Sequence, residues 1–264
     1  MILNADREGR KNTMKIQKLG LQLYTVRSAM DTPEHIRSTF RKIKELGYDE
    51  AQTAGLPLPY EEFAKMAKEE GIAICGTHDS FDRMTEDPDA AMKMHETLGC
   101  KVMGIGGFHP KSVEDVKVFI ERANKLAKAI KPYGFRFDYH NHSHEFIKME
   151  NGKTIMDMLV EELDPEGTSF CLDTCWLQCA GCDVRYWIEK LTGRIEILHL
   201  KDVGRNGEGQ YITEIGNGNL YWEGIIDTAV KTGIKHFVVE QDYCPGDPFD
   251  SIKQSSDYIH KNFM

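Results

Sequence analysis

Eight short apolar segments recur along the chain, and this repeat limits the possible folds more than any other feature. Helical patterns separate most of them. Strands that alternate with helices indicate βαβ units and a parallel sheet. The segments are LGLQLY (19–24), YDEAQT (48–53), IAICGTH (72–78), KVMGIGG (101–107), FRFDYHNH (135–142), SFCLDT (169–174), IEILHL (195–200) and HFVVEQ (236–241).

The intervening stretches show helical periodicity and helix stop signals. In 34–46 the apolar residues fall on one helix face, and Gly47 follows as a C-terminal stop. The range 113–130 repeats this spacing over a longer helix. Further glycines stand shortly ahead of later segments, at Gly71, Gly99, Gly134 and Gly233.

Eight units without an evident linker favour a single-domain (β/α)8 TIM barrel in the α/β class. The chain has 264 residues, close to the roughly 250 that this fold needs. An open doubly wound sheet is the alternative, but it would more often carry a glycine-rich loop after the first strand. Here YTVRSAMDTP (24–33) follows instead, with no glycine. We expect residues 19–264 to form the barrel and residues 1–18 a polar N-terminal tail.

Composition narrows the function classes. The net charge is −9, whereas nucleic-acid binders usually present a basic face. No apolar run approaches the roughly 20 residues of a membrane span, and the N-terminus lacks the apolar core of a secretory signal. Seven cysteines, an odd number, indicate a reducing compartment. We expect a cytoplasmic protein with neither nucleic acid nor membrane as partner; a homo-oligomer or a second subunit stays compatible.

The segment CLDTCWLQCAGC concentrates four of the cysteines. A zinc or iron–sulfur site is one interpretation, and small buried residues around a strand and its loop are the other. The spacings match no standard metal pattern, and Cys171 falls on a predicted strand, so we favour the second. The four residues are Cys171, Cys175, Cys179 and Cys182.

Polar residues at the carboxyl ends of the strands are the candidates for chemistry, because barrel active sites lie there. The last four strands carry a carboxylate, a carboxylate, a histidine and a carboxylate: Glu145, Asp173, His199 and Glu240. Such a set suits a divalent ion, and three carboxylates without a cation would repel one another. Taken singly, Asp173 is more typical of a helix N-cap or turn residue than of a ligand, and His199 is more typical of a hydrogen-bonded core histidine.

The run YHNHSHEF on the fifth strand is the densest functional signal. On an extended strand His140 and His142 point the same way and Asn141 the opposite way. A zinc site made only of this run is the rival interpretation. We expect Glu145, just past the strand, to return to the barrel mouth, which leaves His142 free as a base or substrate ligand.

With these residues the chain resembles the sugar phosphate isomerase/epimerase superfamily, the xylose isomerase-like TIM barrels, from about Leu19 to the C-terminus. The resemblance implies a metal held by one residue from each of the last four strands, here Glu145, Asp173, His199 and Glu240. Mn²⁺ is the ion we expect, with Mg²⁺, Co²⁺ or Zn²⁺ as alternatives. The motifs are GLQLYTVR, YHNHSHEF, LDTCW, HLKD, EIGNGNLYW and VVEQDYCPGDPFDS.

The implied reaction is proton abstraction next to a sugar carbonyl through a metal-stabilised enediolate. We expect an isomerase or epimerase of a keto-sugar or sugar phosphate, with Glu145 and Glu240 flanking the substrate. The alternative is a 3-keto-glycoside lyase or related dehydratase with His142 as base. The H-x-x-E spacing of His142 and Glu145 resembles a subgroup that includes such lyases.

Further residues are expected to bind the small-molecule sugar. His78 is placed to meet a hydroxyl, Trp176 to stack on a sugar face, and Lys201 to meet a substrate oxygen unless it pairs with Asp202. Gln22 ends the first strand. Glu214 precedes the glycines of EIGNGN, near the mouth, and we expect KDVGRNGEG (201–209) to be a loop rather than a phosphate cradle.

Two hypotheses from other classes of function remain open. An endonuclease IV-like DNA-repair enzyme would use a similar barrel, but it would need more histidine ligands and a surface suited to DNA; the acidic charge opposes this. A non-catalytic barrel that only binds a sugar or a partner is the other.

Overall fold

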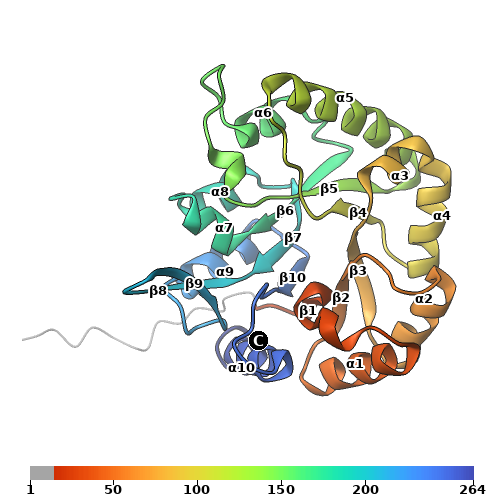
Figure 1. The fold of residues 1–264 in the computed structure, drawn as a ribbon, viewed down its shortest axis with the longest axis vertical. Helices are drawn as coiled ribbons and strands as arrows, with labels where there is room; N and C mark the ends of the chain where they lie inside the picture. Colours follow the sequence, from red (N-terminus) through yellow and green to blue (C-terminus); the bar gives the residue numbers. More distant parts are fainter. Residues whose placement is uncertain (1–14) are drawn as a thin grey trace, which may run out of the picture.

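A closed barrel of eight parallel strands forms the centre of the molecule (Figure 1). The structure is a computed structural model that describes residues 15–264. Each barrel strand overlaps one of the eight predicted segments, which confirms the TIM barrel. The strands are β1 (Leu19–Gln22), β2 (Glu50–Ala54), β3 (Ala73–His78), β4 (Val102–Ile105), β5 (Arg136–His140), β6 (Thr168–Asp173), β7 (Ile195–Leu200) and β10 (His236–Val239).

Helices surround the barrel, and most of them begin at a residue whose side chain caps the helix. Ser112 and Asp115 form a capping box at the start of α5, and Gly99 ends α4 with a φ of 78°, in the left-handed region that favours glycine. The helices are α1 (Pro33–Glu45), α2 (Tyr60–Glu69), α3 (Phe81–Glu86), α4 (Pro88–Leu98), α5 (Val113–Ile130), α6 (Ile155–Glu162), α7 (Thr174–Cys179), α8 (Val184–Lys190), α9 (Trp222–Lys231) and α10 (Pro248–Phe263), with short 3₁₀ turns at Leu23–Ala29, Lys131–Tyr133 and His144–Phe146.

Apolar side chains fill the barrel below its carboxyl end. Successive strand residues point alternately to the barrel axis and to the helices. The inward set forms a compact layer of its own, and the outward set packs with the helices into the main core. The polar inward residues therefore lie above a buried apolar layer, which we call the floor of the barrel. That floor consists of Cys75, Val102, Cys171, Ile197 and Val238.

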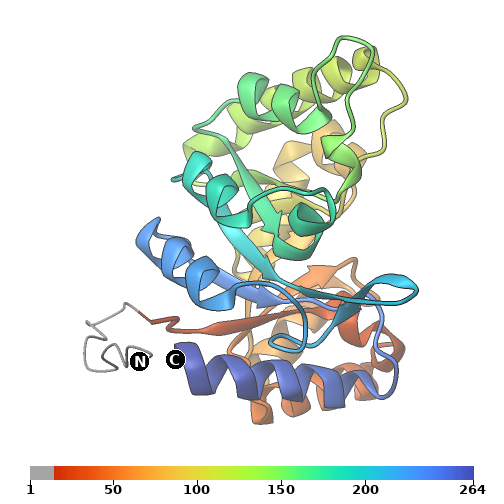
Figure 2. The ribbon, with the colours of Figure 1, turned by 90° about the vertical axis from the view of Figure 1, so that its left-hand side faces the viewer.

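One expectation about local structure is wrong. The segment that we expected to be a loop after β7 forms an antiparallel hairpin of β8 (Asp202–Asn206) and β9 (Gly209–Thr213). Figure 2 shows this hairpin projecting beyond the barrel. Its turn is Asn206 to Gly209, where the Asn206 side chain accepts from the amides of Glu208 and Gly209.

The predicted N-terminal tail lies mostly outside the described residues. Ile16, inside that predicted range, is buried, and its amide donates to the carbonyl of Phe263 at 3.0 Å. The last helix, α10, lies beside α1 in both views of the ribbon (Figures 1 and 2). The packed part of the chain therefore begins before Leu19.

Candidate active site

Four buried side chains converge at the carboxyl end of the barrel. His140 ends β5, Asp173 ends β6, His199 lies on β7, and Glu240 follows β10, so four neighbouring strands supply them. One ligand atom from each lies within 4.8 Å of the others. His199 Nδ1 is 3.0 Å from Glu240 Oε2 and 3.7 Å from Asp173 Oδ2. Three of the four predicted ligands are therefore gathered at one point, joined by His140.

The atoms that face one another in this group lack hydrogen bonds. Among residues 15–264, His140 Nε2, Asp173 Oδ2, His199 Nδ1 and Glu240 Oε2 are all buried without a partner of acceptable hydrogen-bond geometry. Buried polar atoms in native proteins are nearly always satisfied. Two imidazole nitrogens face a common centre with two carboxylate oxygens, which the Lys201 ammonium contacts at 3.0 and 2.6 Å. This set matches the donors of a divalent ion.

Asp173 caps a helix and also faces the buried cluster. Its Oδ1 accepts from the amide of Trp176 at 2.9 Å and caps α7. Its Oδ2 turns to the histidines, 3.5 Å from His140 Nε2. One carboxylate therefore fixes the start of a helix and contributes to the buried cluster.

Lys201 is the positive charge of this cluster. Its side chain is fully buried, and its Nζ lies 3.0 Å from Asp173 Oδ2, 2.6 Å from Glu240 Oε2 and 2.8 Å from Asp242 Oδ2. It does not pair with Asp202, whose carboxylate accepts from Gly216 N and Trp222 Nε1. The salt bridge that we considered for Lys201 is therefore replaced by contacts with the predicted ligands.

These charges set the pKa values of the group. Burial by itself raises the pKa of a carboxyl, but the Lys201 ammonium and the nearby imidazoles hold the pKa values of Asp173 and Glu240 well below their usual range. Burial lowers the pKa of Lys201, yet Asp173, Glu240 and Asp242 outweigh it and raise that pKa well above its ordinary value. The carboxylates are thus ionised and the lysine protonated.

A buried glutamine pair orients His199. Gln22 Nε2 donates to Gln52 Oε1 at 2.9 Å, and His199 Nε2 lies 2.5 Å from the same oxygen. Because Gln52 Oε1 accepts, His199 carries a proton on Nε2 and turns Nδ1 to the cluster. Gln22 also contacts His78 Nδ1 at 3.3 Å. Gln22, expected to bind substrate, is fully buried and instead belongs to this supporting network.

Glu145 stands apart from the four-residue group. Its Oε1 accepts from the Tyr139 hydroxyl at 2.9 Å and its Oε2 from the His142 amide at 2.8 Å. It groups with His142 and His144. The 3₁₀ turn that starts at His144 does not return Glu145 to the mouth; it folds the carboxylate back against β5. His140 takes the place in the cluster that the sequence suggested for Glu145.

A cavity of about 380 Å³ opens above the cluster. Burial, helped by His140, lowers the pKa of His142 to about 3, so this imidazole stays neutral at physiological pH. Three acidic groups line the cavity, and no lysine or arginine does among the described residues. The lining consists of Tyr24, Ala54, His78, Asp79, Gly106, His140, His142, Glu240 and Asp242.

Two residues that we expected to bind substrate, Trp176 and Glu214, differ in their position relative to the cluster. The Trp176 ring is 5.5 Å from the His142 ring and 5.2 Å from Lys201 Nζ, so it lies beside the cluster. Glu214 is not among the residues that line this cavity: its Oε1 accepts from Ser251 at 2.7 Å and its Oε2 from Thr213 at 2.9 Å. It ties the segment after the hairpin to α10.

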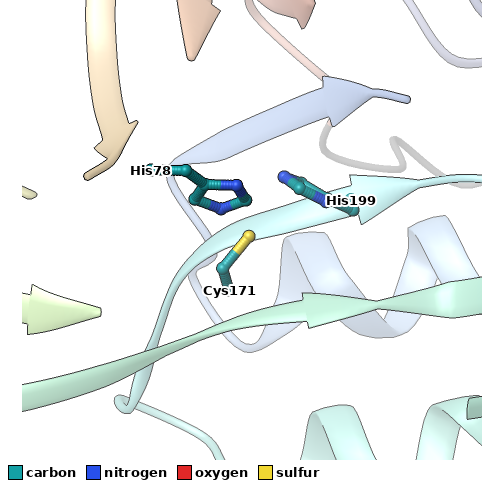
Figure 3. Close-up of side chains that lie close together, drawn as sticks. All are labelled: His78, Cys171 and His199. Carbon is teal, nitrogen blue, oxygen red and sulfur yellow. The ribbon is translucent and has the colours of Figure 1, made fainter. Parts of the chain in front are cut away.

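A second group of close side chains consists of His78, Cys171 and His199 (Figure 3). Figure 3 shows the Cys171 sulfur directed at the two imidazole rings. The other clustered cysteines lie elsewhere: Cys175 and Cys179 are one turn apart on α7, with sulfurs 3.9 Å from each other. Within the described part of the chain the four cysteines share no common centre, which agrees with the interpretation as small packing residues.

Comparison with known proteins identifies the class. Residues 40–261 match the xylose isomerase-like TIM barrel family, and the chain belongs to this family.

Two of the similar proteins illustrate its range. An inosose dehydratase from Mesomycoplasma hyopneumoniae is 26% identical over 159 residues, which cover 52% of this chain and 51% of that protein. The alignment thus spans about half the length of that curated relative. A crystal structure of a sugar phosphate isomerase/epimerase from Parabacteroides distasonis superposes with a TM-score of 0.79 at 22% identity, covering 100% of this chain and 99% of that one.

Over residues 15–264, none of the helices combines the length and apolar character needed to cross a bilayer.

Proposed function

We propose that this protein is a divalent-metal-dependent enzyme that removes a proton next to the carbonyl of an unphosphorylated keto-sugar and then eliminates the β substituent, as a dehydratase or lyase. The observation that carries the proposal is that the His142 ring lines the cavity above the cluster, with its centre 4.7 Å from that of the His140 ring. The family membership and the dehydratase relative support this reaction class.

The metal would be held by His140, Asp173, His199 and Glu240, whose open donor atoms face a common centre. Two imidazoles and two carboxylates suit Mn²⁺, Co²⁺ or Zn²⁺, and we propose Mn²⁺ as in the sequence-based expectation. Bound there, a divalent ion supplies positive charge beside the substrate oxygen that becomes negative when the neighbouring carbon loses its proton. Glu145 would support His142 rather than bind the ion.

His142 would act as the base. Its ring lines the cavity, its Nδ1 is buried without a hydrogen-bond partner, and its amide is fixed by Glu145. The imidazole would accept the proton, the C–H electron pair would form a new C=C bond, and the β substituent would leave with its bonding electrons. The imidazolium would return the proton to this group, which departs as water or an alcohol. General base catalysis of this kind contributes about 10²–10⁴-fold.

The charge of the cavity argues against a phosphate ester. Asp79, Glu240 and Asp242 line it, and a phosphate brought there would meet three carboxylates without a lysine or arginine of the described lining to receive it. Phosphate sites in proteins usually present arginine, lysine or a helix N-terminus. Neutral hydroxyl groups, in contrast, can donate to carboxylates.

Isomerisation or epimerisation is the second candidate. It needs a further group that returns the proton, and Glu240, which lines the same cavity as His142, is available. The pair expected from the sequence, Glu145 with Glu240, is less suitable because both Glu145 oxygens are engaged by Tyr139 and His142.

Product analysis of the Mn²⁺-loaded protein distinguishes these reactions. The panel holds 4-nitrophenyl 3-keto-glucoside, a free inosose, free ketoses and ketose phosphates. We expect release of nitrophenol or water from a free keto-sugar and no reaction with phosphates. Interconversion of two ketoses without elimination would establish the second candidate instead, and turnover restricted to phosphates would contradict the proposed substrate class.

A further inference from the structure

We propose that Lys201 is an internal counter-cation that occupies the carboxylate side of the cluster in the metal-free protein and is exchanged for the divalent ion when it binds. The inference rests on the proposed metal site but concerns a separate property, the competition between two cations for the same oxygens.

The position of Lys201 follows from the strand that carries it. It lies two residues after His199 at the end of β7, and alternate strand residues share a face, so both point into the barrel. Its side chain has no exposed surface. A lysine buried to this degree is rare unless it is paired, and here it contacts three carboxylates at once.

Lys201 shares its closest oxygens with the proposed ion. The Nζ lies 2.6 Å from Glu240 Oε2 and 3.0 Å from Asp173 Oδ2, and these are two of the four open donor atoms of the cluster. A transition-metal ion binds carboxylate oxygens at about 2.0–2.2 Å. An ammonium and a divalent ion on the same two oxygens would lie within a few ångström of each other and repel strongly.

A second position for the ammonium is already in place. Asp242 Oδ2 lies 2.8 Å from Nζ, and the Asp242 side chain is 31% exposed at the cavity rim, whereas Asp173 and Glu240 are buried. Release from the two inner carboxylates would leave Lys201 held by Asp242 and turned to the cavity. Metal loading would thus neutralise the inner carboxylates, while Lys201 and Asp242 would remain as one ion pair without net charge.

Lys201 would keep the inner carboxylates paired when no metal is bound. Without Lys201, three carboxylates would face one another with only the two histidines nearby. Removing one partner of a buried ion pair is strongly destabilising because it leaves uncompensated charge. Loss of Lys201 should therefore weaken the metal-free fold and strengthen metal binding, two effects of opposite sign from one substitution.

The test compares Lys201→Met with Lys235→Met, which removes an exposed lysine paired with Glu196 on the other side of the barrel. Mn²⁺ affinity is measured by calorimetry, and thermal unfolding is followed with and without Mn²⁺. For Lys201→Met we expect at least about tenfold tighter Mn²⁺ binding, a lower melting temperature without metal, and a larger increase on metal addition. The Lys235→Met variant should bind Mn²⁺ as the wild type does.

Equal or weaker Mn²⁺ binding by Lys201→Met, with normal binding by the wild type, would overturn the exchange and leave the metal site standing. Binding by neither protein would overturn both proposals. If Lys201→Met does not fold without metal, lysine ammonium NMR of the wild type decides. The ammonium resonance of Lys201, observable because this group is buried, should shift or disappear on Zn²⁺ addition. An unchanged resonance with Zn²⁺ bound would contradict the exchange.

Discussion

Asp173 shows how one residue can belong to both the scaffold and the site. Oδ1 caps α7 through the amide of Trp176, while Oδ2 faces His140 and Lys201. The two roles can be separated because Asn keeps an oxygen acceptor but loses the charge, whereas Ala loses both.

We predict that Asp173→Asn weakens Mn²⁺ binding at least about tenfold and leaves the fold intact. Asp173→Ala should also lower the free energy of unfolding of the metal-free protein relative to Asp173→Asn, by about 1 kcal/mol for the lost cap. Calorimetry and urea unfolding measure the two effects. Identical unfolding of both variants would show that the cap contributes nothing.

Gln52 offers a second test at the residue scale. Replacing it with Leu removes the acceptor for His199 Nε2 and should weaken Mn²⁺ binding about 10–100-fold, the usual effect of losing an outer-shell partner. Gln178→Leu, an exposed glutamine on α7, is the matched control. Unchanged affinity in the Gln52 variant would mean that packing alone orients His199.

For single residues, the sequence predicted which residue types form the cluster better than it predicted which of them contact one another. Asp173, His199 and Glu240 sit at strand ends, where the barrel period fixes their direction, and they do converge. Glu145 follows the end of β5, where no period applies, and the local turn decides its orientation. His140 was visible as the inward residue of β5, and that alternation was the available signal for it.

At the scale of the elements, the carboxylate of Asp202 holds the segment between β9 and α9 in place. Asp202 accepts from Gly216 N at 2.9 Å and Trp222 Nε1 at 2.6 Å. A Cβ at Gly218 would lie 2.2 Å from Asp202 Oδ1 and 2.7 Å from the Val203 carbonyl. Only glycine leaves room for this approach.

We therefore predict that Gly218→Ala lowers the free energy of unfolding by about 2 kcal/mol, the scale of overpacking a filled site. Gly207→Ala is the control, because a Cβ there meets nothing within 4 Å and the backbone needs no positive φ. Equal unfolding curves for the two variants would show that the segment adjusts freely. Thermal or urea unfolding measures both.

A second element-scale prediction concerns the opposite end of the barrel. Glu196 on β7 pairs with Arg136 of β5 and Lys235, each at 2.9 Å. Burial raises the pKa of Glu196, but these two cations outweigh it and lower that pKa below 4.5. A carboxyl with a lowered folded-state pKa stabilises the protein above its unfolded-state pKa and loses this contribution as pH falls through the folded value.

Glu196→Gln should therefore lower the free energy of unfolding by about 1–2 kcal/mol near pH 7, and the difference from wild type should shrink below about pH 4.5. Glu189→Gln, at an exposed glutamate of α8, serves as control. Urea unfolding across this pH range tests it. A difference that is constant with pH would contradict an ionic origin.

The hydrophobic pattern of the sequence predicted the helices and strands correctly where one side of the element is strongly buried. Barrel strands and long helices such as α5 matched their expected positions because their apolar residues repeat with a fixed period. The β8–β9 hairpin was missed because its strands are largely exposed beyond Gly204 and rich in glycine and polar residues, so no hydrophobic period marks them.

For the whole molecule, the closed barrel explains why residues distant in sequence meet. Gln52 and His199 are 147 positions apart but hydrogen-bonded, since β2 and β7 both point into one narrow interior. The eightfold repeat predicts this closure and the end of the barrel that carries the site. It does not predict which inward side chains pair, because that depends on strand register and on the small shifts between β6 and β7.

The central claim is that His142 takes a proton from the carbon next to a keto-sugar carbonyl. The most direct measurement is deuterium incorporation at that carbon in D₂O, followed by proton NMR with the Mn²⁺-loaded wild type and His142→Gln. We predict rapid exchange or elimination with an unphosphorylated keto-sugar, and a loss of about 10²–10⁴-fold in His142→Gln with Mn²⁺ affinity unchanged. Equal rates for the two proteins would contradict the account.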